Sequence, residues 1–256
     1  MSGTGPAPEL TERQELRYAR HLILDEVGEE GQARLLASRV LVVGAGGLGS
    51  PALLYLAAAG VGTLGIVDSD VVELSNLQRQ VVHATDRVGM AKTKSAIEGL
   101  SAVNPEARLI PHQLRLDASN VEALVEAYDL VLDGSDNFAT RYLLNDACAR
   151  LRKPLVAASL LRFEGQLSTF KPWTGGPCYR CLHPAAPPPG LVPRCEEAGI
   201  LGAVAGVMGT LQAVEAVKEL LGIGDGLSGT LVLYDALGAR FTRIKVPRDP
   251  GCPACG

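Results

Sequence analysis

Residues 39–50 read RVLVVGAGGLGS, an aliphatic run that ends abruptly in a cluster of glycines. The run 40–43 predicts a strand that is buried on both faces, and the small residues after the glycines predict a helix. Gly44, Gly46 and Gly49 have the GxGxxG spacing of a phosphate-binding turn between such a strand and helix. Glycine lets a phosphate approach the backbone, and a helix N-terminus offers unpaired N–H groups. Because glycines also permit close packing, the motif alone leaves a nucleotide site and a purely structural turn open.

Composition sets the broad class. The chain has 256 residues, of which 47% are hydrophobic and 20% charged, so it can form a sizeable core. Its net charge of -4 and the lack of a basic stripe predict no nucleic-acid partner. The N-terminus lacks a signal-peptide pattern, and the longest apolar stretch, 198–211, is too short to span a membrane. We therefore expect a soluble, cytoplasmic protein with no membrane partner.

Strand and helix patterns alternate along the chain as far as residue 158. This alternation predicts an α/β fold with a Rossmann-like, doubly wound and mostly parallel sheet. Beyond that point, residues 166–170, 230–234 and 241–246 predict antiparallel strands, and residues 199–221 predict a long helix. We expect the antiparallel strands to extend the same sheet.

The expected domain organisation follows from this pattern. Residues 1–8 are predicted to be a disordered tail, and residues 9–256 are predicted to form a single domain. Its nucleotide-binding part spans about residues 39–160, and its second part, about 161–256, contains two pairs of cysteines.

A polar, cationic segment follows the second predicted strand. Asp68 ends that strand, where an acidic residue of a dinucleotide fold binds ribose hydroxyls, although a loop aspartate can also cap a turn. Asn76, Arg79 and Gln80 follow within a dozen residues, and Lys92 comes next. Taken singly, such cations are usually surface charges. Together they favour a triphosphate over a nicotinamide cofactor, because guanidinium and ammonium groups hold phosphates.

A second acidic cluster, GSDN, follows the strand predicted near residue 130. Asp136 in this cluster can hold a Mg²⁺ that bridges phosphates, because open α/β sheets bind ligands beyond the carboxyl ends of their strands. The alternative role is helix N-capping, which Ser135, Asp136 or Asn137 can each perform. Asp133 is interpreted as a structural residue, and the role of Asp70 stays open.

The six cysteines include two CxxC pairs, Cys178 with Cys181 and Cys252 with Cys255. Two such pairs predict a closed, tetrahedral zinc site of the structural type, with two disulfides or free thiols as the alternatives. A catalytic zinc needs an open coordination position, which four thiolates do not leave. Cys148 lies in an apolar helix pattern and is expected in the core.

Seven motifs occur in one order along the chain: RYARHLIL, GAGGLGS, DSDVVELSNLQRQ, GMAK, DGSDN, PCYRCL and GCPACG. In this combination the chain resembles the family of MoeB, ThiF and HesA, bacterial relatives of ubiquitin-activating enzymes. The resemblance runs from about residue 17 to residue 256 and is strongest to the MoeB branch.

The resemblance implies an adenylyltransferase. Such enzymes use Mg-ATP to adenylate the C-terminal glycine of a ubiquitin-like sulfur carrier of the MoaD or ThiS type, which ends in Gly-Gly, and they release pyrophosphate. The pathways served are molybdopterin synthesis, thiamine synthesis or tRNA thiolation. The resemblance also implies a homodimer, a carrier-binding role for the zinc-containing part, and a separate sulfur donor, either a cysteine desulfurase or a rhodanese.

Site residues are carried over from the family position by position. Gly47 is expected against the phosphates, Asp68 on the ribose and Asp136 on Mg²⁺, while Arg20 is expected to reach into the neighbouring subunit's ATP site. The full nucleotide-contacting set is Gly44, Gly46, Gly47, Gly49, Asp68, Ser75, Asn76, Leu77, Gln78, Arg79, Lys92, Asp136 and Asn137. The catalytic roles are assigned to Arg20, Arg79, Lys92, Asp136 and, through a thioester or disulfide link to the carrier, Cys195.

Other functions remain open at this stage. A dinucleotide-dependent oxidoreductase can be built on the same glycine turn, and an inactive nucleotide fold can act as a scaffold. Within the family, a peptide or tRNA-like carboxylate can replace the carrier. His21, His83, His112 and His183 share no spacing and are expected to be ordinary surface or hydrogen-bonded residues.

Overall fold

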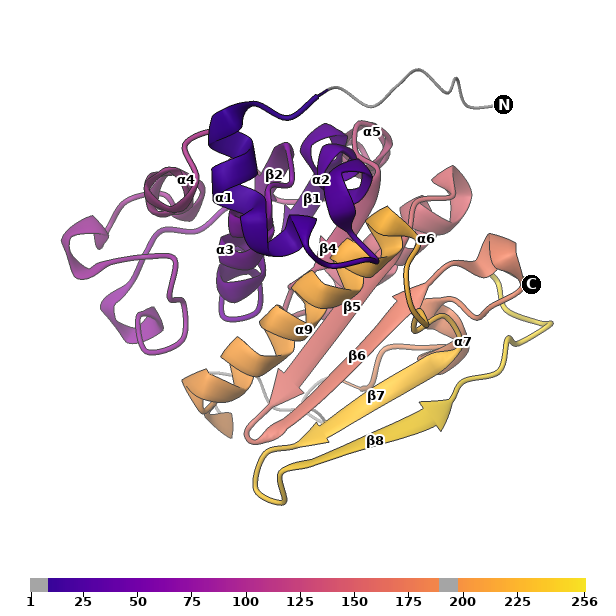
Figure 1. Ribbon diagram of the computed structural model, residues 1–256. Helices are drawn as coiled ribbons and strands as arrows, with labels where there is room; N and C mark the ends of the chain where they lie inside the picture. Colours follow the sequence, from indigo (N-terminus) through magenta and orange to yellow (C-terminus); the bar gives the residue numbers. More distant parts are fainter. Residues whose placement is uncertain (1–8, 189–197) are drawn as a thin grey trace.

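The computed structural model describes residues 9–188 and 198–256, and its framework is one mixed sheet of eight strands (Figure 1). The strand order is β3-β2-β1-β4-β5-β6-β7-β8. The tail expected at residues 1–8 lies outside the described residues. The strands are β1 (Arg39–Val43), β2 (Thr63–Val67), β3 (Arg108–His112), β4 (Leu130–Asp133), β5 (Leu155–Leu161), β6 (Glu164–Phe170), β7 (Thr230–Asp235) and β8 (Arg240–Lys245).

The first five strands are parallel, which confirms the predicted Rossmann-like half of the sheet. β1 pairs with β2 on one side and with β4 on the other, and β3 and β5 continue the sheet outward. The strand order therefore reverses between β1 and β4. In doubly wound sheets this switch point marks the edge where ligands bind.

β1 is buried on both faces, as its aliphatic sequence predicts. Val40 and Val42 belong to one hydrophobic core, and Leu41 and Val43 belong to another on the opposite face of the sheet. Successive side chains of a strand point to opposite faces, so each layer of helices receives alternate residues of β1. A fully buried aliphatic side chain stabilises the fold by about 2 kcal/mol, so this strand anchors both layers.

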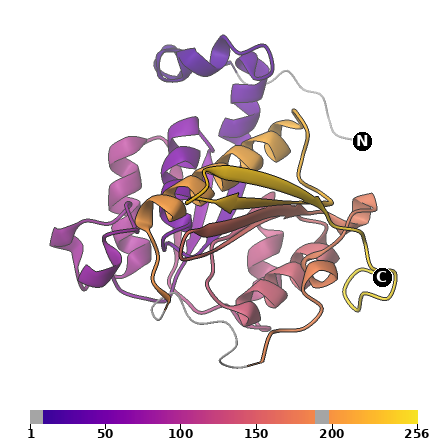
Figure 2. The same ribbon diagram turned by 90° about the horizontal axis from the view of Figure 1, so that it is seen from below.

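Helices cover both faces of the sheet (Figure 2). The first core includes residues of α3, α4 and α9, and the second includes residues of α5 and α6. Among the helices of residues 9–188 and 198–256, none is both long and apolar enough to cross a bilayer. The helices are α1 (Glu12–Leu22), α2 (Gly28–Ala37), α3 (Gly49–Ala59), α4 (Lys92–Val103), α5 (Val121–Glu126), α6 (Phe138–Leu151), α7 (Tyr179–Leu182) and α9 (Gly202–Leu221), with short 3₁₀ helices at Leu74–Asn76, Thr85–Arg87 and Pro172–Thr174.

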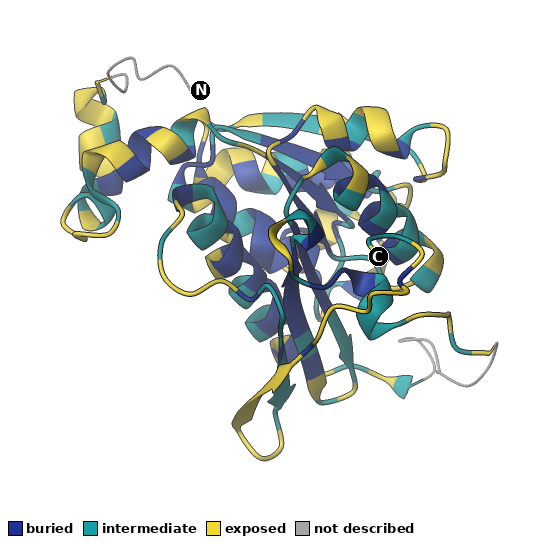
Figure 3. Ribbon diagram, turned by 90° about the vertical axis from the view of Figure 1, so that its right-hand side faces the viewer, coloured by how far each residue is buried: buried dark blue, intermediate teal, exposed yellow. Residues whose placement is uncertain are grey.

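The last three strands are antiparallel and extend the same sheet, as the sequence predicts. β6 pairs with β5 and β7, and β7 pairs with β8. β5 is longer than expected because its last residues pair with β6 rather than with β4. β8 forms the sheet edge and is exposed at every position, and Figure 3 shows this strand in yellow.

Candidate active site

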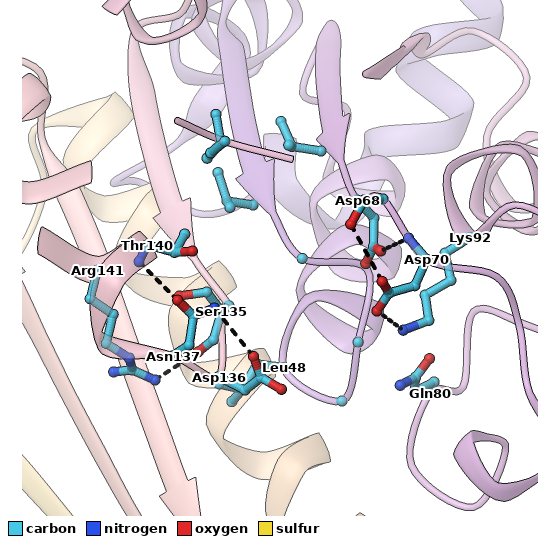
Figure 4. Close-up of a pocket in the computed structure, with 18 of the residues that line it drawn as sticks. Leu48, Asp68, Asp70, Gln80, Lys92, Ser135, Asp136, Asn137, Thr140 and Arg141 are labelled. Atoms are coloured by element: carbon cyan, nitrogen blue, oxygen red, sulfur yellow. Dashed lines mark hydrogen bonds and ion pairs between the residues drawn. The ribbon is translucent and has the colours of Figure 1, made fainter. Parts of the chain in front are cut away.

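A cavity of about 380 Å³ opens at the carboxyl ends of β1, β2 and β4 (Figure 4). Its walls come from the glycine turn, from the segments after β2, β3 and β4, and from α4, α6 and α9. The cavity lies at the switch point of the sheet, where ligands of doubly wound folds bind. Its lining is rich in charged side chains, with Asp68, Asp70 and Lys92 on one side and Asp136 and Arg141 on the other.

The glycines of the turn divide into two groups. Gly44 has a φ of +92°, and a Cβ on Gly49 would lie 1.7 Å from the Gly44 carbonyl oxygen, so these two glycines allow the turn to form and α3 to pack on it. Gly46 and Gly47 line the cavity, whereas Gly49 does not. Within the described residues, the N–H groups of Gly46, Gly47 and Leu48 have no acceptor. Such N–H groups at a helix N-terminus bind anions.

Asp68 is held at the end of β2 by the backbone. Its Oδ2 accepts the Ala45 N–H and its Oδ1 accepts the Asp70 N–H, both at 2.9 Å. Burial raises the pKa of Asp68, while the nearby Lys92 ammonium opposes that rise. A carboxylate oxygen has two acceptor positions, so each can still receive a hydroxyl, as ribose binding requires.

The cations of this wall come from two segments. Lys92, at the start of α4, is buried, and its Nζ lies 3.2 Å from Oδ2 of the exposed Asp70. The role left open for Asp70 is therefore to pair with this lysine. Arg79 also lines the cavity, and its guanidinium donates to the Ser75 carbonyl oxygen at 3.2 Å. Both cations line the same cavity as Gly46 and Gly47 of the glycine turn.

The opposite wall is built by the residues after β4. Asp133 is buried, its pKa is raised by that burial, and it accepts both the N–H and the hydroxyl of Ser135. Asn137 caps α6 by accepting the Thr140 N–H at 2.9 Å, which settles which residue of GSDN caps the helix. Asp136 is thus not used as the cap. Its exposed carboxylate lines the cavity and is the kind of ligand that Mg²⁺ binds.

Several expected site residues lie elsewhere in this chain. Arg20 is exposed on α1, and its side chain does not line the cavity. Asn76 is buried, and its side-chain amide donates to the Ser75 hydroxyl. Cys195 lies outside the described residues. The expected nucleotide contacts that do not line the cavity are Gly49, Ser75, Asn76, Leu77 and Gln78.

The cavity also contains polar residues that were not assigned to the site from the sequence. Gln80 is buried, and within the described residues its Oε1 has no hydrogen-bond partner. Arg141, one turn into α6, donates to the Ser135 carbonyl oxygen at 2.7 Å and so supports the loop that carries Asp136. Gln80 directly follows Arg79 in the polar segment after β2, and this position is the sequence signal that points to it. The unassigned polar lining residues are Ser69, Asp70, Gln80, Arg115, Ser135, Thr140 and Arg141.

The four CxxC cysteines converge, and their Sγ atoms all lie within 4.8 Å of one another. Cys178 and Cys252, and likewise Cys181 and Cys255, have their Sγ atoms 3.5 Å apart. Four thiolates around zinc, with Zn–S bonds of about 2.3 Å, have sulfurs about 3.8 Å apart, so the cluster fits zinc. The donor set is closed, which is typical of a structural site, and it ties the C-terminal segment to α7.

Three histidines and Cys148 are held in structural contacts away from the cavity. His21 hydrogen-bonds Gln32, and His112 hydrogen-bonds the Tyr128 hydroxyl. His183 packs against the ring of Tyr179. Cys148 is buried in the core, as predicted, and burial raises its pKa.

Comparison with known proteins identifies the family. The profile of the ThiF family matches residues 18–254. The chain belongs to the ThiF family. The resemblance to MoeB, ThiF and HesA is thereby confirmed.

Relatives with similar sequences are named as activating enzymes or adenylyltransferases. The chain is 54% identical to the SAMP-activating enzyme E1 of Haloferax volcanii, over 94% of this chain and 88% of that one. It is 52% identical to a sulfur carrier protein adenylyltransferase of Thermus thermophilus, over 94% of this chain and 90% of that one. It is 51% identical to the probable adenylyltransferase/sulfurtransferase MoeZ of Mycobacterium tuberculosis, of which it spans 64%.

Solved structures support the fold. The crystal structure of Escherichia coli MccB with ATP superposes with a TM-score of 0.81 at 23% identity, over 94% of this chain and 74% of that one. Another MccB structure, with MccA-N7isoASN, gives a TM-score of 0.82 at 24% identity, over 94% of this chain and 75% of that one. At this identity the likeness concerns the fold alone.

Proposed function

We propose that this chain is an ATP-dependent adenylyltransferase that activates the C-terminal glycine of a ubiquitin-like sulfur carrier. One observation carries the proposal: Arg79, Lys92 and Asp136, from three separate segments, line one cavity together with the glycine turn, whose N–H groups at Gly46 and Gly47 have no acceptor in the described part of the chain. The names of relatives at 51–54% identity point to the same activity.

The proposed reaction needs no protein nucleophile. The carrier carboxylate attacks the α-phosphorus of ATP, and pyrophosphate leaves. Catalysis then consists of positioning the two substrates and stabilising negative charge. The backbone N–H groups of Gly46 and Gly47 and the side chains of Arg79 and Lys92 provide donors to phosphate oxygens, and Asp68 holds the ribose. Asp136 would hold a Mg²⁺, which neutralises phosphate charge when bound.

The geometry disfavours the alternative functions. A nicotinamide cofactor has no use for a lysine and an arginine beside its ribose carboxylate, whereas a triphosphate does. Asn137 caps α6, so the Asp136 carboxylate is available to a ligand. A scaffold without activity has no need of such a carboxylate.

Several finer parts of the proposal rest on the family resemblance. We propose one adenylation domain over residues 9–256, with the nucleotide part at about 39–160 and the carrier-binding part at about 161–256. We also propose a homodimer in which Arg20 completes the partner's site, and a separate sulfur donor, a cysteine desulfurase or a rhodanese. We also propose a thioester between Cys195 and the activated carrier, in which the Cys195 thiolate attacks the acyl-adenylate carbonyl and AMP leaves. A four-thiolate zinc site requires reduced cysteines, which favours the cytoplasm.

The decisive experiment is ATP–pyrophosphate exchange with zinc-loaded protein and Mg²⁺. Each ubiquitin-like carrier of the same genome that ends in Gly-Gly is offered separately. Exchange that depends on one carrier establishes adenylation and identifies the pathway, whether for molybdopterin, thiamine or tRNA thiolation. Exchange with several carriers indicates an activator shared between pathways. Absence of exchange with every carrier would overturn the proposal and favour a peptide carboxylate or a scaffold.

A further inference from the structure

His83 is a buried residue that joins the glycine turn to α4 from behind the cavity. Its Nε2 lies 2.9 Å from the carbonyl oxygen of Ala45, and its Nδ1 lies 2.9 Å from the hydroxyl of Ser95. Neither His83, Ala45 nor Ser95 lines the cavity. The imidazole therefore contacts the turn on the side that faces away from the cavity.

These two contacts determine the tautomer of His83. The Ala45 carbonyl oxygen can only accept, so Nε2 must carry the proton that is donated to it. Nδ1 then accepts from the Ser95 hydroxyl. Burial, reinforced by the charges of Lys92 and Arg87, lowers the pKa of His83 to about 4. The ring is therefore neutral near pH 7, with one donor that is aimed at the turn.

The hydrogen bond to Ala45 also fixes the direction of the next N–H group. A trans peptide is planar, so the Ala45 carbonyl and the Gly46 N–H point to opposite sides of the same unit. The carbonyl faces His83 and the Ser50 hydroxyl, and Gly46 lines the cavity. The Gly46 N–H, which has no acceptor among the described residues, is thereby turned toward the ligand side.

The glycine at position 46 leaves the peptide between Ala45 and Gly46 less constrained than a peptide between two larger residues, so hydrogen bonds to this peptide matter for its orientation. Glycine accepts φ values that other residues do not, so the backbone at Gly46 does not by itself prevent a flip. The preceding peptide is held separately, because the Ala45 N–H donates to Asp68. Asp68 thus holds the peptide before Ala45, and His83 holds the peptide after it, together with a longer contact of 3.3 Å from the Ser50 hydroxyl.

We propose that His83 is a positioning residue for nucleotide phosphates. Its Nε2–H holds the Ala45–Gly46 peptide in the orientation that presents the Gly46 N–H to the polyphosphate of ATP. This inference rests on the proposed use of ATP and assigns a role to a residue that touches no substrate. Ser95 supports it by fixing the tautomer.

The test compares the binding of ATP and adenosine to the full, zinc-loaded chain by calorimetry. In His83→Leu the donor is lost, so ATP affinity should fall about tenfold, the scale of one hydrogen bond to a charged group. Adenosine affinity should change by less than about twofold, because adenosine has no phosphate. His83→Gln, whose amide can replace the Nε2–H, should retain ATP affinity within about threefold. His112→Leu removes a hydrogen-bonded histidine outside the cavity and serves as the matched control.

The outcomes separate this inference from the proposed function. Equal losses of ATP and adenosine affinity in His83→Leu, or no loss of either, would overturn the positioning role. A glutamine variant as weak as the leucine variant would also overturn it. If His83→Leu does not fold, His83→Asn replaces it, because its shorter amide does not reach Ala45 and the same phosphate-specific loss is expected. If the unchanged protein binds adenosine as tightly as ATP, the proposed phosphate site fails, and this inference fails with it.

Discussion

The cavity and the cysteine cluster are both built from polar atoms, but these atoms face different surroundings. In the cluster the four Sγ atoms face one another within 4.8 Å, so the donor set is closed. In the cavity Asp136, Gly46 and Gly47 line a volume of about 380 Å³, and within the described residues the N–H groups of these two glycines have no acceptor. A closed set can hold one ion, whereas an open set can hold a ligand that reacts. Substitutions in the cavity should therefore change activity more than stability, and substitutions in the cluster should do the reverse.

The largest effect is expected from Asp136→Ala. Because the Asn137 side chain caps α6, the Asp136 carboxylate can be removed without loss of the helix start. ATP–pyrophosphate exchange should fall roughly a thousandfold through loss of the metal ligand. The melting temperature and the zinc content should stay unchanged. Glu126→Ala, which removes an exposed carboxylate on α5, is the control. Full exchange activity in Asp136→Ala would exclude the metal-binding role.

Cys252→Ser tests whether the cysteine cluster stabilises the fold. Loss of one thiolate should release zinc and lower the free energy of unfolding by about 3 kcal/mol, because metal binding contributes to folding. Metal analysis and thermal unfolding measure these changes. Cys148→Ala removes a buried thiol outside the cluster and should leave the zinc content intact. If Cys252→Ser loses zinc but keeps its full stability, the cluster is not a structural site.

Arg20→Ala tests whether the cavity is complete within one chain. Arg20 does not line the cavity of its own chain, so a role in catalysis requires a neighbouring subunit. The variant should lose about a hundredfold in exchange activity. When Arg20→Ala is mixed and re-equilibrated with Asp136→Ala, each mixed dimer has one intact site, on the subunit that carries Arg20→Ala. Because about half of the dimers are mixed, about a quarter of the unchanged activity should return. Mixed dimers with no recovery would place the arginine's action within its own chain or outside catalysis altogether.

The sequence predicted the parts of the fold that depend on local pattern. The aliphatic run at residues 40–43 is confirmed as a strand that is buried on both faces. The alternation as far as residue 158 is confirmed as the parallel part of the sheet. The convergence of the four cysteines was also predictable, because paired CxxC motifs have few structural uses. These features need only a periodicity or a short spacing to be recognised.

Contacts between distant segments were harder to predict. The pairing of Asp70 with Lys92 joins residues on either side of a long irregular segment, and no local pattern encodes it. Gln80 is buried although it follows Arg79 in a polar sequence. His83 was expected to be an ordinary residue, and its contact with Ala45 depends on how that segment folds back on the glycine turn. Side-chain direction in irregular segments is set by tertiary packing.

A pH-dependent loss of stability should accompany the buried position of His83. Its pKa is lowered from 6.5 to about 4 in the folded chain. Between these values the unfolded chain binds the proton and the folded chain does not, so the free energy of unfolding falls as the pH falls. Between pH 7 and pH 5 the loss amounts to about 2 kcal/mol. Denaturant unfolding of the unchanged protein and of His83→Gln at both pH values measures it. An equal pH dependence in the two proteins would contradict the assignment.

The smallest effect is expected from Asp70→Asn, which tests whether Asp70 acts only as the ion-pair partner of Lys92. Lys92 is buried and pairs with an exposed carboxylate, so phosphate oxygens can replace that carboxylate when the nucleotide binds. The substitution leaves the backbone carbonyl of residue 70 in place to accept the backbone N–H of Lys92, and exchange activity should fall less than about tenfold. Lys92→Met, which removes the cation itself, should lose about a hundredfold. Equal losses in the two variants would mean that Asp70 acts on the nucleotide or its metal directly. A smaller loss in Asp70→Asn than in Lys92→Met would show that the nucleotide can take the place of Asp70 beside Lys92. A cysteine of the closed cluster cannot be replaced by a ligand in this way.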